Sequence, residues 1–190
     1  MGFFADFHVH SRYSRSTSPG LELPELAHWA EMKGIAVVGS GDFTHPAWFR
    51  DLEAGLADNS SGLYALKKNQ RSVHFILSSE ISLIYKKAGK VRKVHLLLLA
   101  PSLAAVERIN ASLGRRFNLR ADGRPILGAS VRDISAEVLA IDDRVMIIPA
   151  HIWTPWFSLL GSRSGFDSLE DCFEDYSPYI HAVETGLSAD

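Results

Sequence analysis

Apolar and polar residues alternate along the chain in blocks that predict strands followed by helices. Short apolar runs that end at glycine or a polar residue are typical of buried strands, and apolar residues three or four apart are typical of helices. The strand pattern covers Gly2–Val9, Ile35–Gly39, Val94–Ala100, Val145–Ala150 and Ile180–Thr185, and Val73–Tyr85 contains one or two strands, the first of which ends near Glu80. The helix pattern covers Leu23–Lys33, Pro46–Gly55, Ser102–Leu113, Ser135–Ala140 and Ser168–Tyr176. Strand then helix, repeated, predicts an α/β fold with parallel strands.

Residues that can bind metal ions stand at or near the ends of these predicted strands. His8 and His10 close the first strand, and because side chains two apart lie on the same face, both imidazoles point the same way. The pair alone is equally typical of one buried and one exposed histidine. The further candidate ligands are Asp42, His45, Glu80, His95, His151 and Asp190. Since strand ends converge most easily in a barrel, the set predicts a multinuclear metal site at one mouth of a β/α barrel.

The candidate ligands differ in what their positions indicate. Glu80 and His151 each follow a buried strand. A carboxylate in such a place must be hydrogen-bonded, paired or metal-bound. Glu80 can bridge two metals, and an ordinary salt bridge is the alternative. His95 opens its apolar run, which is the wrong end for a parallel strand. This position favours a core histidine unless the strand is antiparallel or His95 lies on a loop. Asp42 is equally suited to cap the helix that follows. Asp190 ends the chain, where residues are often frayed.

Other polar and aromatic residues suggest supporting roles. Asp6 shares the face of His8, and Glu184 sits at a strand end, so both are expected to orient metal ligands from outside the coordination sphere. Arg12 and Arg15 follow the first histidines and suit phosphate binding, with a solvated loop as the alternative. Trp153 and Trp156 follow His151 and could stack on a base or pack on their own core.

Composition narrows the class of protein. The chain has 190 residues, of which 46% are hydrophobic and 22% are charged, and this composition indicates a globular domain. Its net charge of −2 gives no overall electrostatic reason to expect a nucleic-acid partner. Cys172 is the one cysteine, so no intrachain disulfide is expected, and a reducing cytoplasm is the simple interpretation. No apolar run has the length of a signal or a membrane span. A complete eight-stranded barrel takes about 250 residues. Either the barrel is open or, as we expect, residues 1–190 are one barrel domain that is incomplete at its C-terminus.

Six motifs together carry a resemblance to a known family: HVH, GDFTHP, SSEIS, KVHLLLLA, PAHIWTP and ETGLSAD. The chain resembles the PHP (polymerase and histidinol phosphatase) superfamily, and within it the N-terminal catalytic part of the endonuclease Q family of DNA repair nucleases. The resemblance departs at Thr17, where many members carry Asp, and at Asp190, where the usual Asp-x-His ending stops without its histidine. Endonuclease Q proteins also continue into a C-terminal half with a zinc-binding cysteine cluster that helps to grip DNA.

The resemblance implies a fold, a cofactor and a set of ligands. The implied fold is a distorted (β/α)7 TIM-like barrel with two to three divalent ions, zinc or manganese. One metal would be held by His8, His10, Glu80 and Asp190, a second by Glu80, His95 and His151, and a third by His45 with Asp42. Glu80 and Asp190 would be the catalytic carboxylates, and DNA with a deaminated base would be the substrate.

We therefore predict a metal-dependent phosphodiester hydrolase. Bound metals would lower the pKa of a water and neutralise phosphate oxygens, so no Ser or Cys nucleophile is needed. A phosphomonoesterase acting on a small phosphorylated metabolite is the first alternative, because the same metals serve both reactions. An amidohydrolase is a weaker alternative, since Glu80 stands where that family has a modified lysine. A non-catalytic metal-binding domain is the third. The sequence does not indicate the oligomeric state.

Overall fold

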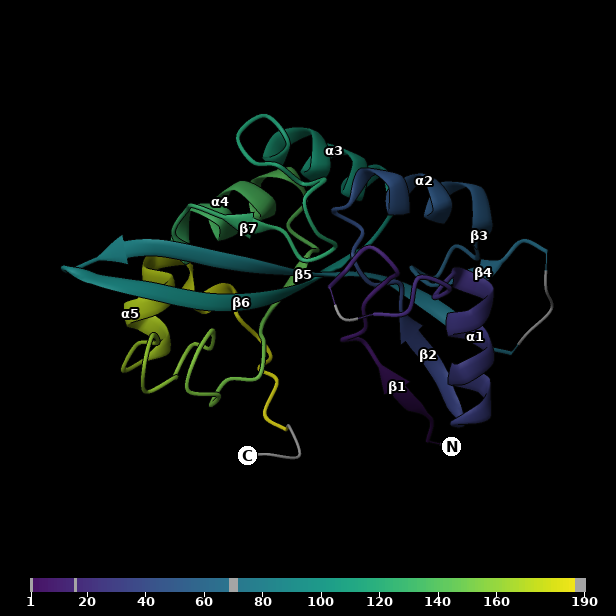
Figure 1. The fold of residues 1–190 in the computed structure, drawn as a ribbon, viewed down its shortest axis with the longest axis horizontal. Coiled ribbons are helices and arrows are strands. Elements are labelled where there is room, and N and C mark those ends of the chain that lie inside the picture. The colour runs from purple at the N-terminus through teal and green to yellow at the C-terminus, as the bar shows by residue number, and fades with distance from the viewer. Residues whose placement is uncertain (1, 16, 69–71, 187–190) are drawn as a thin grey trace. The chain divides into compact units, whose positions relative to one another are not determined.

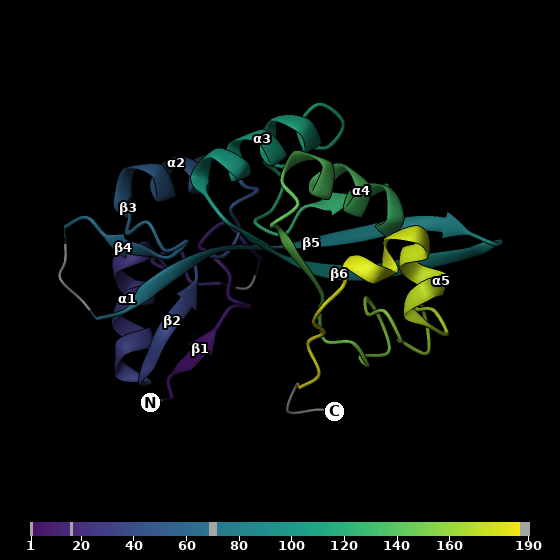
Figure 2. The same cartoon turned by 180° about the vertical axis from the view of Figure 1, so that it is seen from behind.

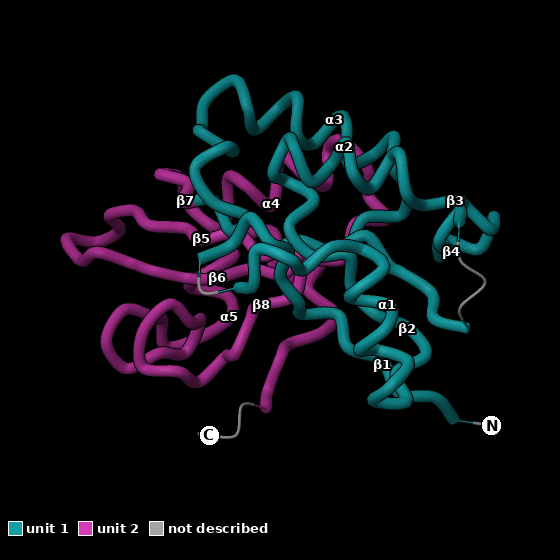
Figure 3. Tube along the Cα trace, turned by 45° about the vertical axis from the view of Figure 1, so that its right-hand side comes forward, with its two compact units in different colours: residues 1–79, 99–125 teal, residues 80–98, 126–190 magenta. Residues whose placement is uncertain are grey.

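The computed structural model describes residues 2–15, 17–68 and 72–186 (Figure 1). In chain order its elements are β1 (Phe4–Asp6), α1 (Leu23–Met32), β2 (Ile35–Gly39), α2 (Pro46–Gly55), β3 (Leu56–Asp58), β4 (Tyr64–Leu66), β5 (His74–Lys87), β6 (Lys90–Ala100), α3 (Leu103–Leu113), β7 (Ile126–Leu127), α4 (Val131–Ile141), β8 (Met146–Pro149), α5 (Leu169–Phe173) and the 3-10 helix η1 (Glu174–Tyr179). The chain forms two compact units, coloured separately in Figure 3. Unit 1 comprises 1–79 and 99–125, and unit 2 comprises 80–98 and 126–190, so β5 and β6 contribute to both.

Unit 1 is built on a mixed sheet with the order β1-β2-β5-β4-β3. β1 runs parallel to β2 and β2 parallel to β5, whereas β4 is antiparallel to both β3 and β5. Helix α1 lies beside β2 in both opposite views (Figures 1 and 2). The side chains of Phe43, Trp48, Leu52 and Phe75 are fully buried and form the centre of this unit's core.

Unit 2 is built around a hairpin formed by β5 and β6. A two-residue turn joins the strands, with Ala88 at φ 49° and Gly89 at φ 75°, and such short turns connect antiparallel neighbours. β7 pairs in parallel with β5 at Ser82 and Leu83, and β8 pairs with β6. Cys172 of α5 is buried, and this burial raises the pKa of its thiol to about 12.

The predicted α/β class is confirmed, and the bounds of β2 and α2 agree with those predicted from the sequence. The sheet is open: within the described ranges its path ends at β1 and β3 and does not close into a barrel. From His74 onward the predicted segment Val73–Tyr85 is one strand, β5, and the polar residues Ser78, Ser79 and Glu80 are buried in its middle.

Two further expectations about strands need correction. β6 begins at Lys90, earlier than predicted, so His95 lies inside an antiparallel hairpin strand and its position is no longer anomalous. The predicted strand Ile180–Thr185 is not formed. Glu184 nevertheless pairs with the end of β8, since its N–H donates to Pro149 and its carbonyl accepts from Ile152.

Among the described helices, none combines the length and apolar character that crossing a membrane requires.

The hairpin core gives a test of the fold. Leu98 on β6 is fully buried, and Val91 on the same strand is 49% exposed. We expect Leu98→Ala to lower the free energy of unfolding by about 2–5 kcal/mol, because it removes buried apolar contacts and leaves a cavity. Val91→Ala is the matched control and should change it by less than about 0.5 kcal/mol. Urea denaturation followed by circular dichroism measures both, and equal effects would contradict the described burial.

Candidate metal centre

Unit 2 brings a carboxylate and two imidazoles together. Glu80 comes from β5, His95 from β6, and His151 from the turn directly after β8. Glu80 Oε1 lies 2.6 Å from His95 Nδ1 and 3.2 Å from His151 Nε2, and these two nitrogens are 3.2 Å apart. Glu80 and His95 are buried and His151 is partly exposed, so the group has one side open toward solvent.

The hydrogen bond of His151 to Thr154 indicates which of its nitrogens carries a proton. His151 Nδ1 lies 3.0 Å from Thr154 Oγ1, whose hydroxyl is also placed to donate to the carbonyls of His151 and Trp156. If the hydroxyl hydrogen goes to a carbonyl, the oxygen accepts from Nδ1–H, and Nε2 keeps its lone pair. In that arrangement His151 Nε2 and Glu80 Oε1 face each other as two acceptors, and either a hydrogen on His95 Nδ1 or a bound cation can lie between them.

The backbone of His151 is held in an unusual conformation that aims its ring. Its φ of 32° lies in the left-handed region, which few non-glycine residues adopt. The N–H of His151 donates to the side-chain carboxylate of Glu184 at 2.6 Å. Glu184 was expected to orient a ligand from outside the coordination sphere, and the structure places this hydrogen bond on the backbone of His151 and not on its imidazole.

The loop after His151 packs against the same group. Phe157 lies with its ring 4.7 Å from that of His95, and its carbonyl accepts from the His95 N–H. Trp153 and Trp156 are each about half exposed, at 54% and 51%. The Lys93 ammonium lies 5.0 Å from the Trp156 ring centroid and 5.2 Å from that of Phe157. The loop therefore covers His95 with Phe157, and it exposes the aromatic ring of Trp156 beside the Lys93 ammonium.

The residues present fit a divalent metal ion. Glu80, His95 and His151 each offer one ligand atom, and these atoms lie within 4.8 Å of one another. A carboxylate with two imidazoles suits zinc, manganese or iron. The ion-pair partners of the buried Glu80 in this group are His95 and His151, which are charged only when they are protonated. A metal ion would supply the positive charge that favours burial of a carboxylate.

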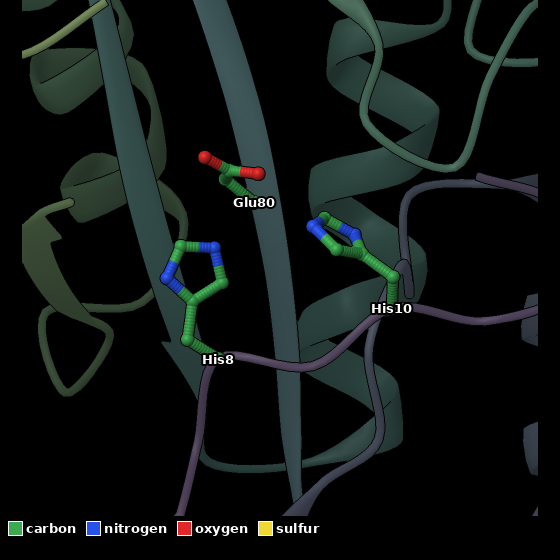
Figure 4. Close-up of side chains that lie close together, drawn as sticks. All are labelled: His8, His10 and Glu80. Atoms are coloured by element: carbon green, nitrogen blue, oxygen red, sulfur yellow. The ribbon is translucent and has the colours of Figure 1, made fainter. Parts of the chain in front are cut away.

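Unit 1 places the predicted His-x-His pair after β1. The rings of His8 and His10 are 5.7 Å apart at an angle of 64°, and Figure 4 shows these two side chains. His10 Nδ1 lies 2.9 Å from Asp42 Oδ1. Asp6, also expected to orient a ligand, accepts from the backbone N–H of His8 at 3.3 Å.

The loop that carries Asp42 is fixed by hydroxyl groups that sequence reasoning missed. Ser78 N donates to Ser40 Oγ, and Gly41 N donates to Ser78 Oγ, so the loop after β2 is attached to β5. Trp48 Nε1 donates to the carbonyls of Ser40 and Gly41. Serine is common in every kind of loop, so the sequence offered no signal that singled out these two.

His45 stacks on Tyr13 with ring centroids 4.2 Å apart and an angle of 16°. Its Nδ1 is buried and has no hydrogen-bond partner among the described residues. Burial lowers the pKa of His45, and this effect outweighs the opposing backbone hydrogen bond with Arg120 and the charge of Asp42. Its role as a metal ligand stays a prediction.

The other predicted site residues lie as follows. Arg12 is held by Glu22 and Asp51, which occupy its guanidinium. Arg15 is 90% exposed and lies 3.5 Å from Asp122. Asp190 lies outside the described residues, so its predicted catalytic and metal-binding roles stay predictions.

Comparisons with known sequences give relatives of much greater length. No protein-family model matches the chain. The uncharacterised protein YqxK of Bacillus subtilis is 31% identical over 200 residues, which cover 98% of this chain and 49% of YqxK. An uncharacterised protein of Methanocaldococcus jannaschii is 28% identical over 170 residues, which cover 87% of this chain and 18% of that protein. The chain thus spans half or less of the length of these relatives.

Solved structures give a named neighbour. The lesion-specific endonuclease PfuEndoQ of Pyrococcus furiosus matches with a TM-score of 0.81 and 32% identity, over 98% of this chain and 42% of that one. An endonuclease Q in complex with a 27-mer duplex that has an abasic lesion at the active site gives a TM-score of 0.81 and 33% identity, over 98% and 43%. A protein described as a metal-dependent phosphoesterase, from Bifidobacterium adolescentis, shares the fold at a TM-score of 0.55 and 15% identity, over 97% and 77%. The resemblance to endonuclease Q is therefore confirmed, and these neighbours are hydrolases.

The buried His45 generates a prediction about acid stability. Because folding lowers its pKa, the unfolded chain binds more protons between the folded pKa and the ordinary value of about 6.5. The contribution of His45 to stability is therefore complete above about pH 6.5 and is lost as the pH falls below it. With metal removed by a chelator, urea denaturation at a series of pH values should show a smaller loss of stability on acidification for His45→Gln than for the wild type. His28→Gln, at a partly exposed position of α1, is the control, and parallel curves for wild type and His45→Gln would contradict the prediction.

Proposed function

We propose that the protein is a metal-dependent phosphodiester hydrolase that acts on DNA. The group formed by Glu80, His95 and His151 carries the proposal, because a buried carboxylate between two imidazoles has the donor chemistry of a metal centre. The similarity to endonuclease Q over nearly the whole chain supports DNA as the substrate class. Zinc or manganese is the proposed metal, and a TIM-like barrel related to (β/α)7 folds is the proposed architecture of the whole protein.

The same proposal assigns roles to the remaining predicted ligands. His8 and His10, whose rings lie together in unit 1, are proposed as ligands of a second ion. When bound, divalent ions lower the pKa of water and neutralise phosphate charge. The chain's own part is to hold Glu80 and its histidines in place. β5 and β6 fix the carboxylate and His95, and Thr154 would keep the proton of His151 on Nδ1 when its own hydroxyl donates to a backbone carbonyl. Asp190 and His45 are proposed as further ligands.

The substrate contacts are proposed from the loop beside this centre. Trp153 and Trp156 are exposed aromatic residues that closely follow His151, and Lys93 adds a positive charge. Unpaired bases stack on exposed aromatic rings, and a cation attracts the phosphate backbone. A base turned out of the duplex is the contact that this surface fits best, and damage to a base makes such a movement easier.

Removing the carboxylate of Glu80 tests the metal centre. We expect the wild type to retain at least one zinc or manganese ion per chain and Glu80→Gln to retain little, because the amide lacks the charge that binds the ion. Glu53→Gln, on the exposed face of α2, is the matched control. Elemental analysis of protein purified without added metal measures both. A wild type that takes up no metal on addition would contradict the proposal.

The same three proteins should be assayed for hydrolysis on duplexes that contain deoxyuridine, hypoxanthine or an abasic position, beside a simple phosphate monoester. Strand cleavage by the wild type and the control but not by Glu80→Gln is expected. Cleavage of the monoester alone would replace the proposal with a phosphomonoesterase acting on a small metabolite.

Substituting the exposed tryptophans tests the proposed DNA contact. Trp153→Ala and Trp156→Ala should each weaken binding of a fluorescent oligonucleotide, since stacking on one base contributes about 1–3 kcal/mol, which is about 5- to 150-fold in Kd. Trp29→Ala is the control, because Trp29 on α1 is equally exposed, at 51%, and lies in unit 1. Fluorescence anisotropy measures all four proteins. A loss of affinity that is the same for Trp29→Ala would contradict a specific role for the loop.

A further inference from the structure

Asp42 is a buried carboxylate, and both of its oxygens already have hydrogen-bonding partners. Its side chain is fully buried. Oδ2 accepts from Ser11 N at 2.6 Å, from Ser11 Oγ at 2.7 Å and from Ser14 Oγ at 2.9 Å. Oδ1 lies 2.9 Å from His10 Nδ1. Oδ2 is fully used by its three donors and Oδ1 is engaged by His10, so a metal ion on Asp42 would have to share Oδ1 with the imidazole.

The same contacts determine where the proton of His10 lies. An ionised carboxylate only accepts, so His10 Nδ1 must be the protonated nitrogen that donates to Asp42. Ser14 Oγ is 3.2 Å from this nitrogen, and because its hydrogen goes to Asp42, its oxygen faces Nδ1 as a second acceptor. Every hydrogen in the group is thus accounted for with Nδ1 protonated, and the neutral ring keeps its lone pair on Nε2.

The backbone around Asp42 is built for this arrangement. Asp42 has a φ of 46°, a left-handed conformation that aspartate tolerates better than most residues. Gly123 covers the carboxylate, and a Cβ atom at that position would lie 2.2 Å from Asp42 Oδ2 and 2.4 Å from Ser14 Oγ. The φ of Gly123 lies outside the positive range, so the space beside Asp42, and not backbone conformation, requires glycine there.

We infer that Asp42 is a positioning residue for His10 and not a metal ligand. It holds His10 as the Nδ1–H tautomer and so presents Nε2 outward, with Ser11, Ser14 and Gly123 fixing the carboxylate. This differs from the ligand role expected of Asp42 from the sequence. Only the use of Nε2 for metal binding rests on the proposed function; the tautomer belongs to the metal-free chain.

The tautomer can be measured directly. Long-range proton–nitrogen correlation spectra of the metal-free protein at about pH 8, with His10 assigned by the loss of its signals in His10→Gln, should show one tautomer with the proton on Nδ1. Asp42→Asn should disturb it, since the amide can turn a donor toward Nδ1. Gly123→Ala should do so by displacing the carboxylate, and Ser14→Ala, a milder change, covers the case in which Asp42→Asn does not fold. Gly128→Ala is the control, because nothing lies within 4 Å of a Cβ atom there.

Metal affinity is the second measurement. Loss of a group that orients a histidine typically weakens metal binding by about 10- to 100-fold, so chelator competition should show this loss for Asp42→Asn and Gly123→Ala but not for Gly128→Ala. A wild type with mixed tautomers, or variants that lose thermal stability while the His10 spectrum stays unchanged, would overturn the inference. A tautomer that switches as expected in a chain that binds no metal would support the positioning role and count against the proposed function alone.

Discussion

Three consecutive polar residues, Ser78, Ser79 and Glu80, are buried in the middle of β5. Burial of such groups is costly unless each finds a hydrogen bond or an opposite charge. Ser78 is satisfied by the loop after β2, Ser79 by Thr44, and Glu80 by His95 and His151. The organisation of each unit around β5 follows from this requirement, since the partners must come from segments brought to that strand.

Sequence patterns predicted the regular elements where local chemistry is decisive. β2 is a five-residue apolar run bounded by glycine, and α2 begins at a proline in its first turn, so their bounds follow from neighbouring residues. The full length of β5 and β6 did not follow, because the residues next to the turn are mostly lysine and arginine, which are not buried and break the apolar pattern. The short strands β3 and β4 were missed because three residues show no periodicity.

The candidate site shows the same division between residue type and residue role. Histidines and carboxylates at strand ends could be selected from the sequence, and Glu80, His95 and His151 do lie together. Spacing along the sequence does not indicate which of these side chains would face a metal and which would face a neighbouring imidazole. That depends on the positions of individual atoms in the folded chain. Asp42 was grouped with the ligands because of its type, but its side-chain contacts are with His10, Ser11 and Ser14. Thr154 and Gly123 gave no signal because their contribution is one hydroxyl and one missing methyl group.

The single cysteine has a consequence for experiments on the whole chain. Alkylating and disulfide reagents react with the thiolate, and a thiol that is buried and has a pKa of about 12 supplies almost none of it near neutral pH. Cys172 therefore does not react with these reagents while α5 is packed, and it becomes reactive once that helix is exposed. The natural sequence thus contains its own chemical reporter, whose rate of modification registers the opening of unit 2 without any introduced label.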